Sequence, residues 1–137
     1  MDITQIPFTH LSGLKQEGNF LTLEPLDKVK NHLGTIHASA QFLLAESQCG
    51  LFLQEVFPQY KDKVIALLRS SSVKYKKPAT TTIRAIASIT EEEKEKFLAQ
   101  FMKKNRALIV VSVEVRDEGN ELIMFGEFGW FVQGGVE

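Results

Sequence analysis

One apolar segment constrains the fold of this chain more than any other. Between Leu33 and Gln54 a single residue, Glu46, carries a formal charge. From about residue 38 to 57 the segment is rich in Ala, Leu, Gln and Glu, which favours a helix, and Pro58 fits a stop just past its end. Twenty residues would make a helix about 30 Å long. Because its apolar residues cover almost the whole circumference, we expect protein to surround this helix on all sides.

The other segments predict strands around one further, smaller helix. The strand-like stretches are residues 18–26, 63–75, the run that follows Pro78, and two runs within 107–133 joined by a turn at 117–120. Residues 90–105 predict the second helix. Thr90 and Glu93 form a capping box at its start, and a single apolar stripe that includes Phe97 and Phe101 places it on the surface of the fold.

This order of elements predicts an α+β fold, in which an antiparallel sheet curls round one long central helix. A chain of 137 residues suits a single domain, residues 1–137, with a core from about 18 to 133. A single sheet leaves one edge and part of the helix uncovered. We therefore expect a partner subunit to complete the burial.

Composition excludes several classes of protein. The 16 basic and 17 acidic residues balance, which argues against a nucleic-acid partner. The apolar segment is interrupted at residues 46–48 and is too short to cross a membrane. A single cysteine, Cys49, allows no internal disulfide and no cysteine-based metal cluster. We expect a cytoplasmic protein that needs no metal or other cofactor.

The lone carboxylate of Glu46 is the first candidate for chemistry. Burial in an apolar helix removes its hydration, which is costly unless the group is neutralised or hydrogen-bonded. Loss of hydration also raises the pKa of a carboxyl group, the direction that suits a general base or a poised nucleophile. A buried glutamate with purely structural partners would show the same pattern, so this feature leaves both interpretations open.

The start of the same helix is the second candidate. If His37 precedes the first turn, Ala38 presents a free backbone N–H at the positive end of the helix dipole, where it can hold a carbonyl oxygen that gains charge. The nine residues from His37 to Glu46 amount to roughly two and a half turns and a rise of about 13.5 Å. One subunit therefore cannot bring both groups to one substrate, whereas two antiparallel copies of the helix can.

The spacing N-x-x-G-x-x-H followed nine residues later by an acid is formed here by Asn31, Gly34, His37 and Glu46. It resembles the hot-dog acyl-CoA thioesterases, in particular the branch that includes the phenylacetyl-CoA thioesterases and one class of 4-hydroxybenzoyl-CoA thioesterases. The segment "VKYKKPA" and the helix-then-hairpin end of the chain are similar to that branch as well. The resemblance spans about residues 18–133.

The resemblance implies a hot-dog fold, a homodimer or dimer of dimers, and hydrolysis of an acyl-CoA or acyl-carrier thioester. Glu46 would be the nucleophile or the base that activates water, and the N–H of Ala38 would polarise the thioester carbonyl. His37 would help to hold that end of the site, and Asn31 would orient substrate or water. The resemblance also assigns substrate contacts to Gly34 and Ser39.

Two departures from the family pattern support an alternative. Ala38 and Ser39 stand where the family commonly has Gly-Gly, and Gly50 replaces a hydroxyl residue one turn after the acid. A non-catalytic module that binds acyl thioesters or fatty acyl groups fits these departures.

A second alternative is a hydroxyacyl thioester dehydratase that uses His32, fourteen residues before Glu46.

Other side chains have weaker claims to function. Basic residues near Pro78 could pair with the phosphates of coenzyme A, or could simply be solvated: Lys74, Lys76, Lys77 and Arg84. Of these, Lys76 and Lys77 are the predicted substrate contacts. The aromatic residues Phe128, Trp130 and Phe131 suggest core or dimer contacts, Cys49 suggests a small core filler, and His10 receives no role.

Overall fold

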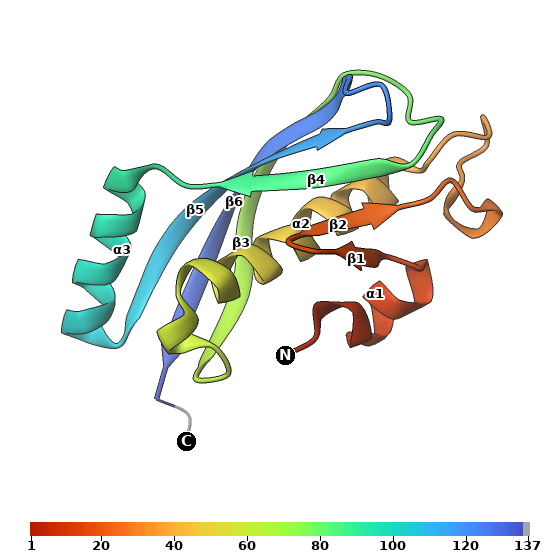
Figure 1. Cartoon of the computed structure of the whole chain (residues 1–137). Coiled ribbons are helices and arrows are strands. Elements are labelled where there is room, and N and C mark those ends of the chain that lie inside the picture. Colours follow the sequence, from red (N-terminus) through yellow and green to blue (C-terminus); the bar gives the residue numbers. More distant parts are fainter. Residues whose placement is uncertain (136–137) are drawn as a thin grey trace.

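The computed structural model describes residues 1–135 and confirms the predicted α+β architecture. Its centre is an antiparallel sheet of six strands in the order β1-β2-β4-β5-β6-β3. The strands are β1 (Lys15–Glu17), β2 (Phe20–Leu23), β3 (Val64–Tyr75), β4 (Ile83–Ser88), β5 (Arg106–Arg116) and β6 (Leu122–Gly134). The long helix α2 (Ala38–Val56) lies along one side of this curved sheet (Figure 1).

Helix α2 begins and ends close to where the sequence predicts. Its inner side packs on β2, β4 and β5, and buries residues such as Leu44, Ala45 and Cys49 completely. A second side, which includes Phe42 and Glu46, is only half-buried in a single chain. The apolar surface of α2 therefore extends beyond the side that a single subunit buries.

Strand β3 forms an open edge of the sheet. It pairs with β6 along its length and has no strand on its other side within residues 1–135. Its side chains are mostly exposed, with Leu67 at 57% and Ile65 at 48%. A bulge between Leu68 and Ser70 lies opposite Gly129, where an added Cβ atom would require the Ser70 hydroxyl to move. A long, apolar, unpaired edge is a surface that proteins usually cover by pairing.

Helix α3 (Glu91–Lys104) covers part of a different edge. Beyond Ser88, β4 no longer flanks β5, and α3 packs there instead, at the far end of the molecule from α1 (Figure 1). The Thr90 hydroxyl caps the helix by accepting from Glu93 N at 3.0 Å, as the capping box predicts. The Glu93 carboxylate does not complete that box. It accepts instead from Val110 N, at 3.2 Å, and so satisfies a donor on the free edge of β5.

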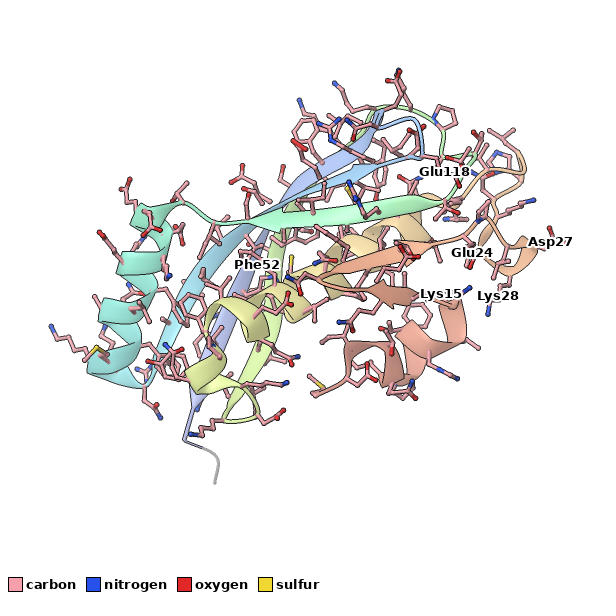
Figure 2. All side chains as sticks on the ribbon, in the orientation of Figure 1. Lys15, Glu24, Asp27, Lys28, Phe52 and Glu118 are labelled. Atoms are coloured by element: carbon pink, nitrogen blue, oxygen red, sulfur yellow. The ribbon has the colours of Figure 1, made fainter. Side chains whose placement is uncertain are left out.

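The N-terminal residues contain structure that the sequence did not predict. A short 3-10 helix η1 (Ile3–Gln5) and the helix α1 (Pro7–Ser12) precede the β1–β2 hairpin. The strand predicted at 18–26 is observed only over Phe20–Leu23, because Gly18, with φ of 61°, and Asn19 form the hairpin turn. At the open end of this hairpin, opposite the turn, Lys15 forms an ion pair with Glu24 (Figure 2).

The run after Pro78 is confirmed as a strand, β4, but it does not pair with the strand before it. β4 lies between β2 and β5, while β3 lies at the opposite edge next to β6. The turn predicted at 117–120 joins β5 and β6, and the carboxylate of Asp117 holds it by accepting from Glu121 N at 2.9 Å. Within residues 1–135, no helix combines the length and apolar character needed to cross a membrane.

Candidate functional site

The N-terminus of α2 presents an unpaired backbone donor. His37 is the N-cap residue, and its Nδ1 lies 3.1 Å from Ser39 N and 2.6 Å from Ser39 Oγ. The imidazole therefore satisfies the amide of the second helical residue. The N–H of Ala38, the first helical residue, has no partner among residues 1–135. This donor lies at the positive end of the helix dipole, among exposed residues.

The loop before the helix is held by Asn31. Its Oδ1 accepts from Leu33 N at 2.9 Å and from Thr35 N at 3.1 Å, and its Nδ2 donates to Thr35 Oγ1 at 2.9 Å. Gly34 adopts a left-handed φ of 79°, which an L side chain rarely does. The N-x-x-G part of the motif thus shapes the loop that delivers the chain to the helix start. Most of the hydrogen-bonding capacity of Asn31 is used within that loop.

The segment after β3 lies against the same helix start. Ile36 N donates to Ala79 O at 2.9 Å, and the Tyr75 hydroxyl lies 3.3 Å from Ala38 O. Between these two contacts, Lys76 lies over the Phe125 ring at 5.8 Å, and Lys77 pairs with Glu121 at 2.6 Å. Tyr75 and Ala79 thus contact the chain at the start of α2, while the side chains of Lys76 and Lys77 contact Phe125 and Glu121.

Glu46 lies in the middle of α2 and borders a cavity of about 340 Å³. The carboxyl group is half-buried and has no hydrogen-bond or ion-pair partner among residues 1–135, and loss of hydration raises its pKa above the ordinary value. The cavity wall is largely apolar and includes Leu43, Leu53 and Trp130. An unpaired carboxylate beside an apolar cavity suits a base or nucleophile.

A single chain does not bring Glu46 to the helix start. Eight residues separate it from Ala38 along one continuous helix, a rise of about 12 Å. The predicted site residues therefore fall into two groups. Glu46 stands alone at the cavity, and the others gather at the helix start: Asn31, Gly34, His37, Ala38, Ser39, Lys76 and Lys77. His32 is exposed in the loop at this same end, also apart from Glu46.

Two further residues have defined environments. Cys49 is completely buried, and burial raises the pKa of its thiol to about 12, so it stays protonated and unreactive at neutral pH. Trp130 is buried and borders the Glu46 cavity, and Phe128 is buried in the core. Within residues 1–135, no three His, Cys, Asp or Glu side chains gather closely enough to hold a metal ion.

Sequence reasoning missed the N-terminal wall of the cavity. Ile3, Ile6, Phe8 and Thr9 border it, although the chain between them and Glu46 contains the whole β1–β2 hairpin. The apolar residues Ile3, Ile6 and Phe8 lie two or three positions apart, which only weakly indicates a short helical segment. Nothing local indicated which part of the fold this segment would cover.

A family model described as "Domain of unknown function (DUF4442)" matches residues 9–132. The chain belongs to this family. No curated protein matches the sequence of this DUF4442 chain.

Solved structures show where else this fold occurs. A Pseudomonas aeruginosa protein of unknown function, described as a "Probable Thioesterase", is 20% identical with a TM-score of 0.83, over 97% of this chain and 91% of that one. A thioesterase from Staphylococcus aureus is 18% identical with a TM-score of 0.72, over 93% of this chain and 98% of that one. A Bacillus halodurans protein solved with CoA is 26% identical with a TM-score of 0.70, over 91% of this chain and 74% of that one. The DUF4442 chain thus has the hot-dog fold of thioesterase-type proteins.

Proposed function

We propose that the protein hydrolyses acyl thioesters of coenzyme A or of an acyl carrier. Glu46 attacks the thioester carbonyl or activates the water that does so, while the Ala38 N–H of a second copy stabilises the oxyanion. The observation that carries this proposal is the pair of unsatisfied groups on α2. One is a carboxylate without a partner beside an apolar cavity, and the other is a free amide at the helix start. The half-buried carboxylate has lost part of its hydration, and the exposed amide is free to donate to a substrate oxygen.

A second copy is needed because α2 holds the two groups about 12 Å apart along its axis. The open edge of β3 offers the interface. Antiparallel pairing of two β3 strands around a two-fold axis would extend the sheet and cover Ile65 and Leu67. It would also set the two α2 helices antiparallel, so that each Glu46 faces the helix start of the other copy. A dimer of dimers is compatible with this arrangement.

The chemical steps require no metal or redox partner. As a base, Glu46 takes a proton from water as the oxygen attacks the carbonyl carbon, and the C–S bond then breaks to release the thiolate. As a nucleophile, Glu46 forms an acyl anhydride and releases the thiolate, and water then hydrolyses the anhydride. In both routes the carbonyl oxygen gains negative charge next to the Ala38 N–H, the position where a helix N-terminus stabilises it most.

Residues around the helix start support this arrangement. His37 fixes the first turn through Ser39, and Asn31 with Gly34 fixes the loop, so all four residues hold the amide in place. In this account the role of Asn31 is to position the site through the loop. The spacing of these residues with Glu46 also supports a relationship to the phenylacetyl-CoA and 4-hydroxybenzoyl-CoA thioesterase branch.

Lys76 and Lys77 suit the phosphates of coenzyme A. They directly follow Tyr75, whose hydroxyl lies 3.3 Å from Ala38 O, and the structural relative from Bacillus halodurans was solved with CoA. The Lys77–Glu121 pair is more than half exposed on both sides. Such pairs contribute little to stability, so a phosphate can compete for Lys77 at small cost.

The test is thiol release from a panel of acyl-CoA esters by the native protein, by Glu46→Gln and by Glu55→Gln. Glu55 is the matched control, because it is an exposed glutamate on the same helix. We expect turnover by the native protein and by Glu55→Gln, and a loss of roughly 10²–10⁴-fold in Glu46→Gln. Native activity in Glu46→Gln would refute the proposal.

An acyl-binding module remains the second candidate. The observation in its favour is that Ser39 directs both its N–H and its hydroxyl to His37, and both Ala38 and Ser39 carry side chains where the family commonly has glycine. Saturable binding of acyl-CoA by the native protein without thiol release would support the module. Hydration of an enoyl-CoA that depends on His32 would instead support a dehydratase.

A further inference from the structure

The cavity beside Glu46 lies between α2 and the N-terminal segment. One side consists of α2 residues at helical spacing, from Leu43 through Glu46 and Gly50 to Gln54, followed by Phe57 just past the helix. The helical residues span about 16 Å along the helix axis. Trp130, on β6, forms part of the wall. The cavity is therefore an elongated space that borders the carboxylate and continues toward the C-terminal end of the helix.

The N-terminal segment, residues 3–9, closes another side of the cavity. Ile3 is 3% exposed and Thr9 is 2% exposed, so both are firmly packed, whereas Ile6 and Phe8 also border the cavity but are exposed. This segment contributes apolar surface without adding a charged side chain. The charged residues Lys61 and Asp62 border the cavity on a different side, which is exposed to solvent.

Gly50 and Ile3 meet at this wall. A Cβ atom added to Gly50 would lie 3.2 Å from Ile3 Cδ1, closer than nearly all such contacts. Glycine weakens the interior of a helix by about 1 kcal/mol relative to alanine, yet its absent side chain lets Ile3 pack directly against α2, one turn after Glu46. A larger side chain at position 50 would therefore have to displace Ile3 or extend into the cavity that both residues border.

We propose that this cavity is the acyl chamber, that it takes an apolar acyl group of medium length, and that Ile3 and Gly50 limit the size it accepts. This inference rests on the proposed thioester hydrolysis. A methylene group is close in size to a water molecule, whose share of liquid volume is about 30 Å³. A cavity of about 340 Å³ therefore holds on the order of ten such groups when full.

The location of Glu46 connects the chamber to the reaction. Because the carboxylate borders the cavity, an acyl chain inside it places its carbonyl carbon next to Glu46, with the thioester sulfur directed outward. Apolar residues make up most of the wall and disfavour a charged or strongly polar acyl group, which would lose its hydration there, whereas Lys61 and Asp62 border the cavity only at its exposed side. The substrate class is therefore a straight-chain or aromatic acyl thioester.

The test measures binding of straight-chain acyl-CoA esters, from acetyl to palmitoyl, to the Glu46→Gln protein, which removes turnover from the measurement. We expect affinity to rise by up to about fourfold per methylene, and to stop rising at medium length. Adding Gly50→Leu should weaken binding of medium-length esters at least tenfold and leave acetyl-CoA unchanged. Adding Ile3→Ala instead should move the preferred length upward by one or two carbons.

The outcomes separate this inference from the proposed function. Affinity that ignores chain length, or an equal loss for acetyl and medium-length esters in Gly50→Leu with normal circular dichroism and melting, would overturn the chamber. If Gly50→Leu does not fold, the upward shift in Ile3→Ala decides, and an unchanged preference there overturns the chamber. Length-dependent binding with no thiol release by the native protein would support the chamber and refute the hydrolysis. Thiol release that does not depend on chain length would support the hydrolysis and refute the chamber.

Discussion

Replacing Ala38 with proline removes the proposed oxyanion donor while keeping the helix. Proline lacks the backbone N–H but is well tolerated at the first position of a helix, which Ala38 occupies. The preceding residue, His37, already has φ of −60° and ψ of 141°, the conformation that a following proline favours. Because the lost N–H has no partner within residues 1–135, we expect the free energy of unfolding to change by less than about 0.5 kcal/mol.

Although its stability should barely change, Ala38→Pro should lose most of its thioesterase activity. Loss of one oxyanion donor costs roughly 10²–10³-fold in kcat, or about 2.7–4 kcal/mol of transition-state stabilisation. The assay is thiol release from the best acyl-CoA substrate, with kcat and KM measured separately. Ala38→Val is the matched control, because it adds similar bulk and keeps the N–H. Native kcat in Ala38→Pro, or an equal loss in Ala38→Val, would refute the assignment of this amide.

Two further predictions concern α2. Loss of hydration raises the pKa of Glu46, so the folded protein binds its proton more tightly than the unfolded chain does. As the pH increases from the ordinary carboxyl value of 4.5 through the raised pKa, the free energy of unfolding should therefore fall and the activity should rise. Urea denaturation and rate measurements at a series of pH values test this, and both dependences should disappear in Glu46→Gln. Gln48→Leu should cost about 2–4 kcal/mol of unfolding free energy by urea denaturation, because Gln48, 2% exposed, bonds to Leu21 N at 2.7 Å and to Asn19 O at 2.9 Å. An equal cost in the exposed control Gln100→Leu would contradict that reasoning.

Local chemistry explains which parts of the fold could be predicted. The start of α2, the cap at Thr90 and the turn at 117–120 depend on residues close in sequence, and the structure confirms all three. The pKa direction of Glu46 also followed from its apolar neighbours along the helix.

Features set by tertiary contacts could not be predicted in the same way. The position of β4 between β2 and β5 depends on long-range pairing, and the N-terminal wall depends on a short segment with little intrinsic preference. The side-chain hydrogen bonds of Asn31 and Gln48 depend on which backbone groups the fold leaves unpaired. The pattern identified Asn31 as important but did not show that its side chain holds the loop.

The central claim is that each reaction site combines Glu46 of one copy with the helix start of another. Mixing two inactive variants tests it. In a mixed dimer of Glu46→Gln and Ala38→Pro, one site carries both changes and the other carries neither. After subunit exchange by mild denaturation and refolding, we expect about a quarter of the native activity to return, as random pairing of a two-fold dimer requires. A mixture that forms mixed dimers and stays inactive would contradict the claim.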